Sequence, residues 1–194
     1  MAFLFPALPD GSFKFTYVSN RKEQRPTSGG STQVINSLGD RFRMETTFKV
    51  RAGQGVGLNA QINANLGQKV RVPVPQPFDI GTPGEAVQVN GSNAGRTLRV
   101  KGLPAGYEFK NGQFVTVVKG AKRYLHQVVG DLSANGAGQA SLAITPMLRT
   151  PLAGNETVEV ANPTIEGFLT NRENPWVLGF VGSVEMTVSV EEAE

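Results

Sequence analysis

The stretch Arg41-Phe-Arg-Met-Glu-Thr-Thr-Phe-Lys-Val50 decides the fold, because its side chains alternate in character. Successive side chains of a β-strand point to opposite faces, so every second residue shares a face. One face of such a strand receives Phe42, Met44, Thr46 and Phe48. The other face receives mainly charged residues, and this division is typical of an antiparallel strand with one buried side. We therefore predict a half-buried strand over 41–50.

Two other stretches alternate in the same way, one near each end of the sequence. Residues 12–18 place Phe13, Phe15 and Tyr17 on one face, and residues 184–190 alternate Val and Met with Glu, Thr and Ser. Half-buried strands of this kind need a common core. We predict that they frame one domain, made of residues 1–86 and 166–194.

The middle of the sequence contains a series of shorter strand patterns separated by turn residues. Asn-Gly and Gly-rich runs lie between them, and both residue types accept the positive φ angles of tight hairpins. Short strands at this spacing indicate a small barrel or sandwich. We predict an inserted domain over 87–165, with strands at 97–101, 114–118, 123–129, 140–145 and 157–160.

One segment has helical spacing. Leu58, Ile62 and Leu66 stand four residues apart, which places them on one face of a short helix, and Gly67 follows as a C-cap. This is the single helix that the sequence predicts.

The residues around this helix predict irregular structure. Gly53-Gln-Gly-Val-Gly57 lacks the strand–helix setting of a phosphate-binding loop, and we interpret it as a flexible loop. Alternating prolines in Val72-Pro-Val-Pro-Gln-Pro77 exclude both helix and a central strand. We predict that this stretch is an extended connector into the inserted domain.

The composition favours no catalytic class. The chain of 194 residues contains no Cys and one His, which removes thiolate chemistry and His-rich metal sites. No apolar run is long enough to span a bilayer. The net charge is +3, from 19 basic and 16 acidic residues, which is too balanced for a dedicated nucleic-acid-binding protein. We expect no membrane-spanning segment and no sequence-specific nucleic-acid binding.

The individual polar residues also suggest structural roles. His126 lies in a strand pattern, and we interpret it as hydrogen-bonded there rather than as a general base or zinc ligand. Trp176 leads into an apolar run and is more typical of a core residue than of a sugar-stacking one. The acidic run Glu191-Glu-Ala-Glu194 is interpreted as a solvated tail. Acids elsewhere adjoin turn residues, so a glycosidase pair is the least favoured alternative. We expect no enzyme activity and no cofactor or metal.

An ordered series of motifs then resembles a known family. The series begins with Gln24 to Gln33, a polar Gly-rich loop, and Leu38 to Phe48, a Gly-Asp turn feeding the strand described above. It continues through 102–106, 111–114, 123–128, 131–138, 140–145, 146–149 and 160–163. This order is similar to that of distal-tail-protein-like subunits of long-tailed (siphovirus-type) bacteriophages. Two departures are Phe42, where the family has a Trp-containing turn, and the Gly- and Asn-rich helix region.

The resemblance implies a mainly β protein with an antiparallel β-sandwich ring domain, one short helix and an inserted small barrel. It further implies a homo-oligomer, typically a hexameric ring, in the distal tail of the virion after assembly in the host cytoplasm. The implied partners are the tail tube protein, the tail-tip hub protein and the tape-measure protein. The alternative function is an accessory module whose inserted domain binds host-surface glycan.

Closed rings use heterologous contacts, in which one patch meets a different patch of the next subunit. Two long polar segments, 20–36 and 51–80, are our predicted contact regions, because loops of that length are uncommon within a compact domain. The predicted subunit-contact residues are Arg21, Lys22, Arg25, Arg41, Arg43, Leu58, Ile62 and Leu66. The basic residues among them could face either the lumen of the ring or an acidic neighbour.

Overall fold

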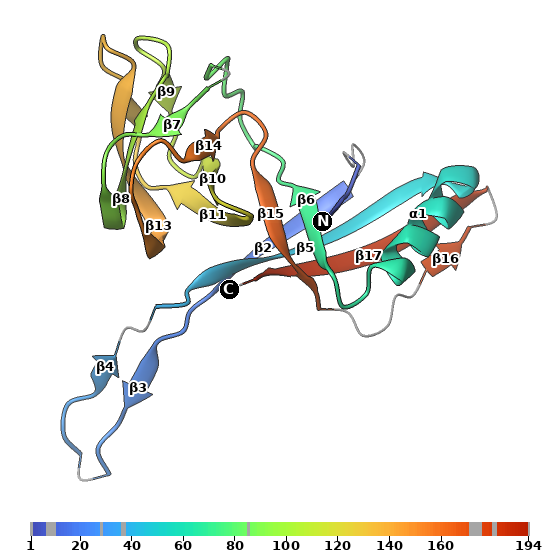
Figure 1. Cartoon of the computed structure of the whole chain (residues 1–194). Coiled ribbons are helices and arrows are strands. Elements are labelled where there is room, and N and C mark those ends of the chain that lie inside the picture. Colours follow the sequence, from blue (N-terminus) through green and yellow to red (C-terminus); the bar gives the residue numbers. More distant parts are fainter. Residues whose placement is uncertain are drawn as a thin grey trace.

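The computed structural model describes residues 2–6, 11–27, 29–35, 38–84, 86–170, 176–179 and 182–193. Within these ranges the chain is mainly β, with one helix, and it forms a large sheet, a small barrel beside the sheet and a projecting arm (Figure 1). The predicted fold class, mainly β with one helix and a small barrel, is therefore confirmed.

The large sheet has seven strands in the described part of the chain, in the order β1-β6-β15-β17-β5-β2, with β16 also pairing with β17. Only β1 and β6 run parallel to each other among these pairs. The three strands with the clearest sequence alternation, β2, β5 and β17, contribute to one core, as their patterns predicted, and they are neighbours in the sheet. The strands are β1 (Phe3–Leu4), β2 (Gly11–Val18), β5 (Arg41–Arg51), β6 (Lys69–Pro73), β15 (Thr164–Leu169), β16 (Trp176–Leu178) and β17 (Ser183–Glu192).

The barrel is closed in the order β10-β11-β13-β8-β7-β14. All of its strands lie between Gln88 and Glu159, and the strands of the large sheet come from both sides of this range. Its interior is filled mainly by Val, Leu and Ile side chains. The strands are β7 (Gln88–Val89), β8 (Asn93–Lys101), β10 (Phe114–Lys119), β11 (Lys122–Val128), β13 (Gln139–Leu152) and β14 (Thr157–Glu159).

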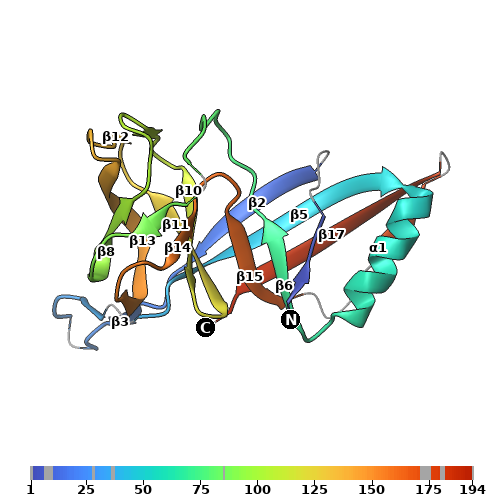
Figure 2. The same cartoon turned by 45° about the horizontal axis from the view of Figure 1, so that its top comes forward.

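Two small ribbons complete the strand structure. Strands β3 (Lys22–Gln24) and β4 (Gln33–Ile35) form a two-stranded antiparallel hairpin that extends away from the body (Figures 1 and 2). Strands β9 (Glu108–Phe109) and β12 (Leu132–Ser133) form a second two-stranded ribbon on the barrel. The segment 20–36, predicted as a loop, is thus largely a hairpin, which we call the arm.

Helix α1 (Ala52–Ala64) packs on the sheet through Leu58 and Ile62, as their spacing predicted. The helix ends before Leu66, and its C-cap is Asn65, so the prediction of Gly67 as the C-cap was wrong.

The helix also includes the segment 53–57, so the prediction of a flexible loop there was wrong. The reason is that the backbone of α1 approaches β17 closely at Gly55. An ideal Cβ on Gly55 would lie 2.5 Å from Val184 Cβ, so the helix reaches this position against β17 only with glycine.

Replacing Gly55 with alanine should therefore destabilise the fold by about 1–3 kcal/mol, the usual cost of overpacking. The same change at Gly53 or Gly57 should instead stabilise it by about 0.5–1 kcal/mol, because alanine favours the helix and nothing lies within 4 Å of either Cβ position. Chemical denaturation of the three variants measures the difference. Equal stabilisation by all three would contradict the close packing of α1.

The helix and the barrel cover opposite ends of one face of the sheet. At the end where β5 and β17 carry Val50 and Val184, the sheet contacts α1. At the other end, Phe114 of β10 packs against Phe42 and Phe15, with ring centroids 5.7 and 4.8 Å apart. The sheet core therefore includes barrel residues, and the two parts of the chain share one apolar cluster.

The predicted connector over 72–77 begins later than expected. Val70 and Val72 are buried in β6, where Val72 pairs with Ile165 of β15. Pro73 pairs with Thr164 at the end of this ladder, where a missing N–H group is tolerated. The extended connector thus starts at Val74, whose amide donates to the Pro163 carbonyl.

Candidate assembly interface

Three of the predicted contact residues, Arg21, Lys22 and Arg25, lie at or beside the first strand of the arm. Every described residue from 21 to 35 is exposed. Within the arm, Glu23 lies 3.7 Å from the Arg21 guanidinium and 3.3 Å from that of Arg25. Exposed ion pairs of this kind add little stability. The arm therefore keeps an excess of positive charge on a surface that its own body does not cover.

The base of the arm is held by a set of hydrogen bonds around Asp40. One carboxylate oxygen accepts from the Tyr17 hydroxyl at 2.6 Å, and the other accepts from the Asn20 amide at 2.7 Å. The Asn20 side chain donates to the Leu38 carbonyl at 3.0 Å. Gly39 has a φ of 124°, and a Cβ there would lie 2.8 Å from the Asn20 amide nitrogen. These contacts join the strands that enter and leave the arm.

Electrostatics at this base favour the ionised carboxylate. Burial works against the charge of Asp40, but the hydrogen bonds from Tyr17 and Asn20 outweigh it and hold the pKa of Asp40 below its ordinary value. Burial, together with the Asp40 charge, raises the pKa of the Tyr17 hydroxyl. The pair therefore stays as phenol and carboxylate at neutral pH, which keeps the arm base hydrogen-bonded.

Two further predicted contact residues, Arg41 and Arg43, bind Glu191 of the neighbouring strand. The Arg41 Nε lies 2.6 Å and the Arg43 Nε 2.9 Å from the two Glu191 carboxylate oxygens. Burial opposes ionisation, but the two guanidinium groups outweigh it and lower the pKa of Glu191. Both arginines thus have a partner within the chain, and they line the sheet face opposite the helix and barrel.

Glu192, unlike Glu191, is buried, and it links the sheet to the barrel. We call the site formed by Glu192, Arg149 and the Phe42 and Leu125 amides the junction. The Glu192 carboxylate accepts from the backbone amide of Phe42 in β5 at 3.3 Å and from that of Leu125 in β11 at 2.8 Å. The Arg149 guanidinium of β13 lies 2.5 Å away. The prediction of a solvated acidic tail over 191–194 was therefore wrong for Glu192, which is 3% exposed and holds three strands together, and Glu194 lies outside the described residues.

The cation that binds Glu192 is largely covered, with 9% of its side chain exposed. Arg149 lies over the Tyr124 ring, 5.0 Å from the guanidinium carbon to the ring centroid. Burial raises the pKa of Glu192 to about 7, although the Arg149 charge and the two amide donors act in the opposite direction. A buried carboxylate with one cationic partner depends strongly on that partner.

His126 is buried in the barrel beside this junction. Its Nδ1 atom is 2.9 Å from the Pro146 carbonyl oxygen, so the interpretation of a hydrogen-bonded strand histidine is confirmed. Burial lowers the pKa of His126 to about 4, and the nearby Arg149 charge acts in the same direction. The ring is therefore neutral at physiological pH.

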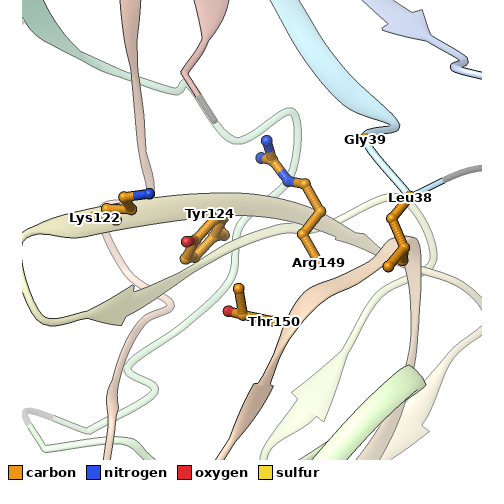
Figure 3. A pocket seen from close by; sticks show the side chains of 6 residues that line it. All are labelled: Leu38, Gly39, Lys122, Tyr124, Arg149 and Thr150. Atoms are coloured by element: carbon orange, nitrogen blue, oxygen red, sulfur yellow. The ribbon is translucent and has the colours of Figure 1, made fainter.

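A small pocket opens where the arm base meets the barrel (Figure 3). Its volume is about 230 Å³, and Figure 3 shows Tyr124, Arg149 and Thr150 from the barrel near Leu38 from the segment that leads into β5. Lys122 and Gly39 also line the pocket. The pocket carries two cationic side chains, and Arg149 is the one already bound to Glu192.

The remaining predicted contact residues divide between core and surface. Leu58 and Ile62 lie in the core of the chain itself, so they are not available to a neighbouring subunit. Leu66 follows the end of α1 and is 38% exposed, which leaves it as the accessible member of the three. Trp176, predicted as a core residue, is 41% exposed on β16, because this strand pairs with β17 near the end of the sheet.

The junction residues Glu192 and Arg149 were missed by sequence reasoning. Forty-three positions separate them, and neither stands in a motif that signals burial. In the part of the chain that the structure describes, no three His, Cys, Asp or Glu side chains gather as a metal site requires. No helix among the described residues is long and apolar enough to cross a membrane.

Neither the protein-family models nor the curated proteins compared with this chain match it.

Proposed function

We propose that this chain is a structural subunit of the distal tail of long-tailed bacteriophages. In this role, copies of the chain form a ring, hexameric by analogy with the family that the sequence resembles. The ring joins the tail tube protein to the tail-tip hub protein around the channel through which DNA leaves, with the tape-measure protein as a further neighbour. The role needs no catalytic residue and no cofactor.

The arm is the observation that best supports an assembly role. A two-stranded hairpin is at best marginally stable in water, yet this one extends from the body with all its described residues exposed. Its base is fixed by Asp40, Tyr17 and Asn20. Val34 and Ile35, on the base side of its second strand, are 48% and 42% exposed. A fixed, partly apolar projection is suited to bind another protein, because its orientation is set before binding.

The open face of the sheet supports the same role. The helix and the barrel both lie on the other face, so the strands present charged side chains such as Lys14, Glu45 and Lys49 to the surroundings. Arg41 and Arg43 lie on this face and are paired with Glu191. A charged face of this kind can border an aqueous channel or a polar neighbour.

The proposal predicts that the purified chain assembles into closed rings. Light scattering after size-exclusion chromatography should give a single oligomer of several subunits, and negative-stain images should show rings with a central hole. Pull-down with the tube and hub proteins of the same virus should recover both. A chain that stays monomeric at high concentration and binds neither protein would overturn the proposed function.

A further inference from the structure

Two exposed ribbons lie on the barrel side of the molecule, away from α1. The arm, β3–β4, projects from below the barrel, and the β9–β12 ribbon lies at the top of the barrel (Figures 1 and 2). Each is a separate two-stranded sheet in the described structure. Such ribbons have outer edges whose backbone N–H and C=O groups can pair with a strand from another chain.

The arm offers positive charge and aliphatic surface together. Lys22 pairs across the ribbon with Ile35, and Glu23 pairs with Val34. Each face of the arm therefore carries an exposed aliphatic side chain. With Arg21 and Arg25, the described arm has three basic residues and one acid. A partner surface should be acidic and partly apolar.

The β9–β12 ribbon has this complementary character. It borders a cleft of about 310 Å³ lined by two acids, Glu108 and Asp131, and one base, Lys110. The Lys110 ammonium lies 2.5 Å from Glu108, whose side chain is 62% exposed. The cleft also offers apolar surface, because Leu132, which lines it, is 36% exposed.

We propose that the arm of one copy docks in the acidic cleft beside β9 and β12 of the next copy. The inference rests on the proposed function and names the contact that would build the assembly. A contact between two different surfaces is heterologous, so it repeats from copy to copy and closes into a ring when the rotation permits. Backbone pairing along a ribbon edge supplies affinity, and the charge complementarity fixes the orientation.

Site-directed crosslinking tests this contact directly, because the natural chain has no Cys. One preparation carries Val34→Cys in the arm, and a second carries Ser133→Cys beside the cleft. Both positions are exposed, so the variants should fold normally. After mixing, a short bis-maleimide should join the two preparations. The matched control replaces the arm variant with Val177→Cys, an exposed valine on β16.

The expected result is about tenfold more heterodimer from the arm pair than from the control pair, as a contact worth about 1.4 kcal/mol would give. Equal yields would overturn the arm–cleft contact. A single chain carrying Val34→Cys and Ser133→Cys separates this inference from the proposed function. Crosslinked oligomers that stop at one closed ring support both the arm–cleft contact and the proposed function. A ladder of crosslinked oligomers without an upper size supports the contact but contradicts the ring. Rings that form without arm–cleft crosslinks contradict the contact alone.

Charge reversal gives an independent measurement of the same contact. Lys22→Glu and Glu108→Lys should each weaken self-association about tenfold, and the two changes combined should restore it. Lys122→Glu, at the exposed turn-side start of β11, is the control for a change in net charge. Failure of the combined variant to recover association would contradict pairing between these two surfaces.

Discussion

Replacing Arg149 with methionine should cost about 3–5 kcal/mol of folding free energy at about pH 8, because it leaves the Glu192 carboxylate buried without a counter-charge. Glu192 is 3% exposed, and its remaining partners are two backbone amides. Arg21→Met, on the exposed arm, is the control, and it should change stability by less than about 0.5 kcal/mol. Chemical denaturation measures both.

The cost of Arg149→Met should shrink as the pH falls. Burial already raises the pKa of Glu192 from 4.5 to about 7, and removing the Arg149 charge raises it further. When folding raises the pKa of a carboxyl group, the group stabilises the fold fully at pH values below its unfolded pKa. This stabilisation is lost as the pH rises through the pKa of the folded state. The variant should therefore approach the wild-type protein near pH 5 and fall furthest below it above pH 7.

A second substitution isolates the charge effect from the loss of packing. In Arg149→Met with Glu192→Gln, the junction carries no charge at any pH. This double variant should recover most of the loss at about pH 8, because replacing both partners of a buried pair is often close to neutral. The stability of this double variant relative to the wild-type protein should also no longer fall between about pH 5 and pH 8 in the way expected for Arg149→Met. A cost of Arg149→Met that is equal at about pH 5 and pH 8 would rule out an ionised Glu192 at the junction.

The β-rich part of the fold was predictable because alternation is a local signal. In β5, residues 41–50 alternate between buried and partly exposed side chains, as their sequence indicated. The strands on either side, β2 and β17, have the same pattern, so a shared core could be predicted, whereas their order in the sheet could not. Local side-chain character determined these elements, and no distant contact was needed to find them.

The start of α1 could not be predicted, because its cause is a tertiary contact. Three glycines in 53–57 disfavour a helix by their intrinsic propensity. In the folded chain, Gly55 lies against Val184, more than a hundred positions away, and only a glycine allows this approach. The residue that looked like a helix breaker is thus the one that the packing of the helix requires.

The candidate interface was predictable in part. The positions of Arg21, Lys22 and Arg25 in a long polar segment indicated an exposed region, and the structure places them on the arm. The role of Glu192 was hidden, since an acidic run near a chain end resembles a solvated tail. Only the approach of β5, β11 and β13 makes its carboxylate a buried link between sheet and barrel.

The junction also depends on a close approach of the β15 and β17 backbones at Gly167. Gly167 of β15 pairs with Glu192 of β17. An ideal Cβ on Gly167 would lie 1.8 Å from the Glu191 carbonyl oxygen and 2.5 Å from its carbonyl carbon. These are backbone atoms, so no side-chain rotation can make room. Any larger residue must push β15 away from β17.

Gly167→Ala should therefore destabilise the chain by about 4 kcal/mol or more. Most substitutions cost less than this, and a loss of this size indicates a specific steric clash. The separation of β15 from β17 would also displace Glu192 from Leu125 and Arg149, so the attachment of the barrel should weaken at the same time. Denaturant unfolding measures the loss, and hydrogen exchange of the Leu125 amide reports the attachment.

A matched glycine in the same sheet provides the control. Gly11 also lies in a strand, but the nearest atoms to its ideal Cβ belong to the Phe13 and Thr46 side chains at 3.3 Å, and these can adjust. Gly11→Ala should change stability by less than about 1 kcal/mol. Should Gly167→Ala fail to fold, soluble yield and circular dichroism beside Gly11→Ala still distinguish the two positions. Equal stability of both variants would mean that β15 and β17 do not approach as closely at Gly167 as the structure indicates.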